Sequence, residues 1–164
     1  MKQPVAYEDA VDLLDADHVA VKKMFIDYSA LCEDGAAADH KLALAERICQ
    51  ALTVHAQLEE ELFYPEVRKV IGADGLMDEA LDEHAQAKNV IARIRAMKAT
   101  DAAYDAAVTE LGALIDRHVL EEREQMFLKA RQAPLDLRGL ALPLLKRKRK
   151  LTQKATPSIS KETP

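Results

Sequence analysis

Apolar residues recur at steps of three and four along four long segments of the chain, which is the period of an amphipathic helix. The four segments span residues 8–31, 39–71, 76–99 and 101–132. Asp39 is expected to cap the start of the second helix, and Pro65 is expected to kink or interrupt it. Gly72 and Pro134 stand where the second and fourth segments should end.

Short connections between such segments make sequential helices antiparallel neighbours, so the pattern predicts an all-α fold, an up-down-up-down four-helix bundle. Residues 1–135 are assigned to this bundle. Residues 136–164 are expected to form a short C-terminal helix that caps one end, followed by a disordered basic tail from Leu151 onward.

Composition supports this fold class and indicates a compartment. Only five Gly and six Pro occur in 164 residues, and β-branched residues are sparse, as in all-α chains. No apolar run approaches the roughly 18 residues that a membrane-spanning helix needs, and the N-terminus has no apolar signal core. We therefore expect a cytoplasmic protein without a membrane span. Cys32 and Cys49 are too few for a disulfide framework and are interpreted as reduced packing residues.

The net charge of −5 conceals an uneven distribution. Residues 141–164 hold 7 of the 23 Lys and Arg but 1 of the 28 Asp and Glu, which leaves 16 bases against 27 acids in residues 1–140. An acidic body of this kind argues against nucleic-acid binding through its own surface. The basic run KRKRK at 146–150 could contact nucleic acid, an anionic membrane or a protein partner; the favoured interpretation is a solvated tail that balances the acidic body.

Four histidines lie inside the apolar stripes, and their pattern is duplicated. His55 and Glu59 are four residues apart, as are His118 and Glu122, so each pair shares one face of its helix. A lone histidine precedes each pair, His18 by 37 residues and His84 by 34 residues. The local context repeats as well, because DADHVAVK at 15–22 is similar to LDEHAQAK at 81–88. The chain therefore looks like two copies of one helical hairpin.

Buried carboxylates need a partner, because an uncompensated charge in a helical core costs several kcal/mol. A single histidine on an apolar face is more often a hydrogen-bonded core residue than a metal ligand. Four such histidines with two glutamates, one cluster on each helix, instead favour a pair of transition-metal ions, since imidazole and carboxylate are a ligand set for them. His40 stands outside the stripe at a helix start and is expected to be exposed.

With these residues in place, the chain resembles the hemerythrin-like, or HHE cation-binding, family over about residues 8–132. The resemblance is carried by DH at 17–18, HAQLEEELFYP at 55–65, EH at 83–84 and HVLEE at 118–122. It implies two iron ions in an oxo- or hydroxo-bridged di-iron centre, bridged by Glu59 and Glu122. The terminal ligands that it implies are His18, His55, His84 and His118. It also implies binding of dioxygen or a relative such as nitric oxide or peroxide.

One position departs from the oxygen-carrying members of that family, which have a second histidine four residues after the histidine of the third helix. Here that position is Lys88, and Lys22 occupies the equivalent place in the first half. The stem of Lys88 is expected to run beside the metal site. The site therefore resembles a variant with four histidines and two glutamates, in which open or water-filled metal positions remain.

Several further acidic residues lie close in sequence to the predicted ligands. Asp17 and Glu83 each adjoin a site histidine in sequence and should point about 100° away from it, so they are not expected to bind metal. Glu121 could supply an occasional extra oxygen, and Glu60 and Glu61 are interpreted as surface charges.

Three functions remain open at this point. The favoured one is a cytoplasmic non-haem di-iron protein, not an enzyme, that binds or senses dioxygen, a related small ligand or iron itself. The alternative is a di-iron oxidase or a peroxide-consuming enzyme. The third is a bundle with a metal-free, histidine-lined core. We expect no output domain fused to the bundle, which argues against a pure sensor, and a protein partner could bind through the basic tail.

Overall fold

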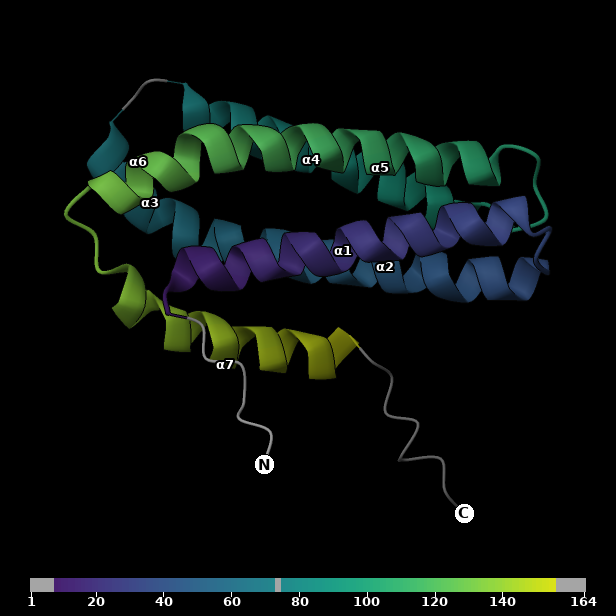
Figure 1. Cartoon of the computed structure of the whole chain (residues 1–164), viewed down its shortest axis with the longest axis horizontal. Helices are drawn as coiled ribbons and strands as arrows, with labels where there is room; N and C mark the ends of the chain where they lie inside the picture. Colours follow the sequence, from purple (N-terminus) through teal and green to yellow (C-terminus); the bar gives the residue numbers. More distant parts are fainter. Residues whose placement is uncertain (1–7, 73–74, 156–164) are drawn as a thin grey trace, which may run out of the picture.

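The computed structural model describes residues 8–72 and 75–155, and the regular structure within these ranges is entirely helical (Figure 1). The helices are α1 (Ala10–Glu33), α2 (Ala38–Leu58), η1 (Glu59–Phe63), α3 (Tyr64–Ile71), α4 (Leu76–Ala96), α5 (Tyr104–Glu121), η2 (Glu122–Met126), α6 (Phe127–Gln132) and α7 (Leu137–Ala155). All four predicted segments are therefore helical. None of the described helices is long and apolar enough to cross a lipid bilayer.

Four rods make up the bundle. The first is α1 and the third is α4, while α2, η1 and α3 follow one another without a break, as do α5, η2 and α6. Figure 1 shows α1 paired with α2 in one hairpin and α4 with α5 in the other, each turning back at the same end of the bundle. The predicted up-down-up-down bundle is confirmed.

The second rod differs from the prediction at its start and in its middle. Ala37, not Asp39, occupies the cap position and offers no side-chain hydrogen bond, and Asp39 lies within the first helical turn. Its carboxylate there still faces the positive end of the helix dipole. Pro65 does not break the rod, because the turn before it is a π-helix that widens the backbone ladder. The fourth rod contains a π-helical turn at the equivalent place, η2.

The apolar core consists of two clusters that lie toward opposite ends of the bundle. Leu14, Leu58 and Ala80 belong to one cluster, and Val21, Leu52 and Ala87 belong to the other. On each of the three helices that carry these residues, one residue of the first cluster and one of the second lie on either side of a site histidine. A polar layer therefore lies between two apolar ones. Cys32 and Cys49 are both free thiols, as expected.

The C-terminal helix is longer than expected and lies elsewhere. α7 continues past Lys150 to Ala155, so the KRKRK run is helical and not part of a tail. Its buried residues Leu137, Leu144 and Leu151 are seven apart and join the first core cluster. α7 contacts α1 and α2 and runs alongside them in Figure 1 instead of covering one end. The tail predicted after residue 155 lies outside the described residues, and the division of the chain at residue 135 stays a prediction.

Candidate metal centre

The structure brings all six predicted ligand residues together in the polar layer of the bundle. Each is at most 6% exposed, and Glu59 is completely buried. They come from all four rods, and both glutamates begin a π-helical turn. The six residues are His18, His55, Glu59, His84, His118 and Glu122. His40 is exposed at the start of α2, as expected.

Each glutamate reaches histidines of both hairpins. Glu59 Oε1 lies 3.4 Å from His55 Nε2 in its own hairpin and 3.1 Å from His84 Nε2 in the other. Glu122 mirrors this arrangement, with Oε2 3.3 Å from His118 Nε2 and Oε1 3.1 Å from His18 Nε2. Each glutamate therefore places its carboxylate between imidazoles of the two hairpins.

A carboxylate supports the outer nitrogen of every site histidine. The Nδ1 atoms lie between 2.7 and 3.1 Å from a carboxylate oxygen. The pairs are His18 with Asp15, His55 with Asp17, His84 with Glu60, and His118 with Glu83. Because an ionised carboxylate only accepts hydrogen bonds, each ring carries a proton on Nδ1 and directs Nε2 inward. Such partners fix the orientation and raise the basicity of histidines that bind metals.

The positions of these supporting acids differ in two respects from what the sequence predicts. Asp17 and Glu83 do point away from the histidine next to them in sequence, but each supports a histidine of a neighbouring rod. Glu60 is not a simple surface charge, because it accepts the hydrogen bond of His84. Glu61 does lie on the surface, where it pairs with Arg147 of α7. Glu121 gathers with other carboxylates at the margin and belongs to neither histidine group.

Each supporting carboxylate also forms an ion pair with a lysine or an arginine. Arg123 lies 2.6 Å from Asp15, Lys148 2.5 Å from Asp17, Lys88 3.1 Å from Glu60, and Arg117 3.9 Å from Glu83. Burial alone would raise the pKa of Asp17, but its contacts with His55 and Lys148 lower it below its usual value. Asp17 is therefore ionised and able to hold the His55 ring. Lys148 belongs to α7, whereas the other three cations belong to the bundle.

The lysines that mark the departure from the oxygen carriers do not direct their ammonium groups at the centre. Lys88 has its stem along the cavity beside the histidines, as expected, but its ammonium group turns outward to Glu60. Lys22 pairs with Asp116 on the surface, 2.9 Å away. The ammonium group of Lys88 therefore contacts Glu60, which in turn holds the ring of His84.

Several buried polar atoms of the layer have no hydrogen-bond partner within the described part of the chain, and this shows whether the layer suits a metal ion. Among the described residues, Glu59 Oε2, Glu122 Oε1 and His118 Nε2 are buried without a hydrogen-bond partner, although they lie close to other ligand atoms. His18 Nε2 and His55 Nε2 are 3.1 Å apart. At this distance the two nitrogen atoms repel each other if both carry lone pairs, and also if both carry protons. Ligands bound at about 2.0–2.1 Å to one metal lie about 3 Å apart when their bonds are perpendicular. The donor set fits a bound cation.

The charge of the layer also favours a cation. Burial opposes a positive charge on His55, but Glu59 and Asp17 outweigh burial and raise the pKa of His55 to about 10. Burial likewise opposes a charge on His118, and Glu122 and Glu59 raise its pKa to about 12. The carboxylates therefore attract positive charge strongly enough to overcome desolvation.

Tyr64 is a site residue that the sequence analysis missed. Its hydroxyl donates to Glu122 Oε2 at 2.6 Å and lies 3.2 Å from both Glu59 Oε1 and His84 Nε2. Burial and the charges of the two glutamates raise its pKa well above the usual value, so the O–H proton is retained. Phe127 is the equivalent residue of the other half, and its ring stacks on His18 as that of Tyr64 stacks on His84. At this position, the two halves of the centre therefore differ by one hydroxyl group.

Asp17→Asn should weaken metal binding about 10–100-fold, because it removes the charge that supports His55. Competition with a chelator of known affinity measures this change. Asp116→Asn is the matched control, since it breaks an ion pair of the surface and should leave metal affinity unchanged. Equal affinity for both variants would mean that the Asp17 contact is not used to hold a ligand.

Two proteins are similar to this chain in sequence or in fold. A DNA nickase from Nostoc sp. is 32% identical over 85 residues, which cover 52% of this chain and 24% of that protein. The chain thus spans about a quarter of the length of that relative. The crystal structure of a hemerythrin HHE cation binding domain-containing protein from Mycobacterium kansasii superposes with a TM-score of 0.73. It is 20% identical, and the match covers 90% of this chain and 89% of that one, which establishes a shared fold.

A family model covers both the bundle and the candidate site. The model of the hemerythrin HHE cation binding domain matches residues 9–130. This range contains all four rods nearly to their ends, all six predicted ligand residues and Tyr64. The chain belongs to the hemerythrin HHE cation-binding family.

Proposed function

We propose that this protein holds two iron ions with the four histidines and two glutamates of the polar layer, and binds dioxygen, nitric oxide or peroxide there. The imidazole and carboxylate donors suit iron, and the buried unpaired atoms of Glu59, Glu122 and His118 support a metal between them. Bound iron would supply redox chemistry and open positions for a small ligand. The surrounding residues orient the ligands, exclude water and hold protons.

The small volume of the cavity beside the candidate metal centre is the main observation in favour of a small ligand. A cavity of about 30 Å³ lies against all four site histidines. Its other walls are mainly apolar and include Val21, Leu52, Ala87, Ile91 and Ile115. About 10–15 Å³ of such volume holds one water molecule, so this space admits a ligand of two or three atoms but no organic substrate. Its apolar walls suit an uncharged diatomic molecule.

Metal content and gas binding test this function together. We expect about two irons per chain. We also expect the visible spectrum of the reduced protein to change when dioxygen or nitric oxide is added, compared with a sample kept anaerobic and without either gas. Ala87→Leu should fill the cavity and weaken gas binding while iron content stays the same, because Ala87 lines the cavity and is not a ligand. Iron-loaded protein that responds to neither gas would contradict the proposal.

Tyr64 supports a second candidate function, a peroxide-consuming or oxidase activity. Its buried hydroxyl group lies within 3.2 Å of three groups of the centre and retains its proton. A positioned proton donor of this kind typically contributes a factor of about 100 or more to a rate. The hydroxyl group of Tyr64 would hold a proton at Glu122 Oε2 for such an activity, which the equivalent Phe127 cannot do.

Tyr64→Phe should therefore lower peroxide consumption on the order of 100-fold, while iron content and nitric oxide binding are retained. Oxygen evolution or loss of peroxide absorbance gives the rate. Tyr104→Phe is the matched control, because Tyr104 is also fully buried but belongs to the apolar cluster away from the centre. A wild-type protein without measurable peroxide consumption would leave ligand binding as the function.

A further inference from the structure

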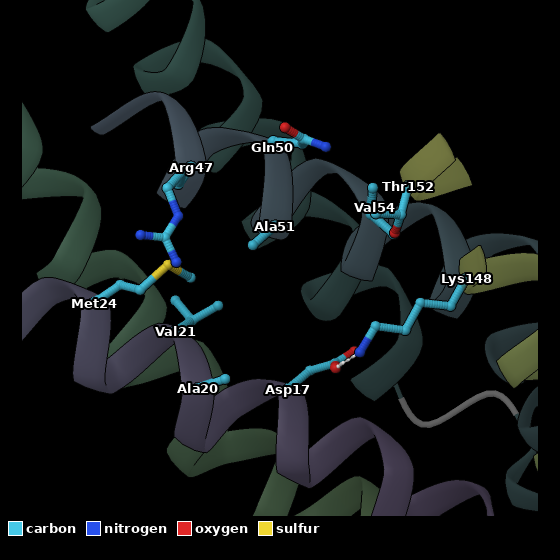
Figure 2. Close-up of a pocket in the computed structure, with 10 residues that line it drawn as sticks. All are labelled: Asp17, Ala20, Val21, Met24, Arg47, Gln50, Ala51, Val54, Lys148 and Thr152. Carbon is cyan, nitrogen blue, oxygen red and sulfur yellow. Dashed lines mark hydrogen bonds and ion pairs between the residues drawn. The ribbon is translucent and has the colours of Figure 1, made fainter. Parts of the chain in front are cut away.

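A groove lies outside the metal centre, between α1, α2 and α7 (Figure 2). Its volume is about 300 Å³, which is the lower end of the range for pockets that hold small organic molecules. Apolar side chains form much of its lining, namely Ala20, Val21, Met24, Ala51 and Val54. The groove exists because α7 lies along the hairpin of α1 and α2, and Lys148 and Thr152 of α7 form part of its wall.

The charges around this apolar lining leave an excess of one positive charge. Arg47 and Lys148 are the cations of the groove, and Asp17 is its acid. Lys148 is engaged with Asp17, whereas Arg47 is exposed and forms no ion pair with any residue that the structure describes. Figure 2 shows Arg47 toward one side and the Asp17–Lys148 pair toward the other, with Val21 and Ala51 between them. The groove therefore presents one unneutralised guanidinium group beside an apolar surface.

We propose that this groove binds a small organic monoanion, a carboxylate with a short apolar body. The carboxylate pairs with Arg47, whose planar guanidinium group matches carboxylate geometry. The apolar body covers Ala20, Met24 and Ala51, which are otherwise exposed or partly exposed to water. A phosphate monoester is a poorer complement, because it carries about −1.5 to −2 charges at neutral pH and would face Asp17.

Binding in this groove couples to the metal centre through one chain of contacts. Lys148 lines the groove and lies 2.5 Å from Asp17, and Asp17 lies 3.0 Å from His55 Nδ1. An occupant beside Lys148 displaces its ammonium group from Asp17 and so changes how firmly Asp17 holds the ring of His55. This coupling rests on the proposed function, since it requires a metal on His55, whereas binding of the monoanion does not.

Calorimetry on the full chain as purified tests the groove with three probes. Hexanoate should bind with one-to-one stoichiometry, whereas acetate, which lacks the apolar body, and hexylammonium, which reverses the charge, should bind at least about tenfold more weakly. Equal binding of hexanoate and hexylammonium would overturn the proposal, and so would the absence of saturable hexanoate binding. Preference for inorganic phosphate over hexanoate would reject the monocarboxylate and leave only a basic surface.

Two variants locate the site. Arg47→Ala should weaken hexanoate binding at least about tenfold, and Ala51→Glu should abolish it by placing a carboxylate in the groove. Arg68→Ala is the matched control, because Arg68 is an exposed arginine of α3 outside the groove. Unchanged binding by Arg47→Ala, with all variants folded by circular dichroism, would place hexanoate elsewhere and overturn the assignment.

The spectrum of the metal-loaded protein tests the coupling separately. Saturating hexanoate should shift the visible bands in the wild type, and Lys148→Met should remove that shift when measured at a hexanoate concentration that saturates the variant. Hexanoate binding without a spectral shift would overturn the coupling and leave the groove intact. A protein that holds no iron but binds hexanoate would contradict the proposed function alone.

Discussion

Glu122→Ala is expected to reduce iron content from about two ions per chain to one or fewer. Glu122 is the only residue of the second hairpin whose carboxylate approaches a site histidine of the first within the described structure, with Oε1 3.1 Å from His18 Nε2. Under the proposed function, removing it would take one oxygen donor from each metal position at once, and it leaves His18 with one fewer neighbour in the layer. Metal analysis after gel filtration, together with the visible spectrum, measures the change.

Glu124→Ala is the control for this experiment. Glu124 lies in the same π-helical turn but is exposed to solvent, so its loss should change neither iron content nor spectrum. Glu59→Ala should behave as Glu122→Ala does, because Glu59 lies between His55 and His84 in the same manner. Two irons and an unchanged spectrum in either glutamate variant would refute the bridging assignment for that residue.

Removal of the metal should lower the melting temperature on the order of 10 °C. A ligand that binds only the folded state adds about 4 kcal/mol of stability at a thousandfold excess over its dissociation constant. For a chain of this size, each kcal/mol corresponds to about 2–4 °C. Without metal, the carboxylates of Glu59 and Glu122 remain buried with unpaired oxygen atoms, which is costly in a core.

Calorimetric melts of verified metal-loaded and metal-free samples at neutral pH provide the measurement. The Glu122→Ala variant serves as an internal reference, because a protein that binds little metal should lose little stability to a chelator. Equal melting temperatures for the two wild-type samples would show that the buried donors gain nothing from a metal and would remove the basis for a metal-stabilised core.

The gathering of the six predicted ligand residues in one layer could be predicted from the sequence because helical periodicity holds as far as each glutamate. His55 and Glu59 share a face at an interval of four, and the same interval joins His118 to Glu122. Tyr64 escaped this reasoning because a residue five positions after Glu59 points about 140° away in a regular α-helix. Only the wider π-helical turn brings its ring to the centre. A possible signal was the aromatic residue at the same interval after Glu122, Phe127.

The supporting carboxylates could not be assigned from the sequence for a different reason. The partner of His84 is Glu60, on another rod, and the partner of His55 is Asp17. Such pairs depend on the axial offset between packed rods, which the period of a single helix does not specify. The docking of α7 did leave a signal that was not used. Leu137, Leu144 and Leu151 recur every seven residues, a stripe that predicts a helix packed along another.

The two π-helical turns impose a condition on chain length. Core residues resume four, five and eight positions after each glutamate, at Phe63, Tyr64 and Val67 and at Met126, Phe127 and Ala130. Deleting one residue from either turn would let the backbone close as an α-helix, but everything beyond it would rotate by about 100°. Val67 would then leave the core. These stretches should therefore tolerate substitutions more readily than insertions or deletions, and the same count of residues should hold in both hairpins.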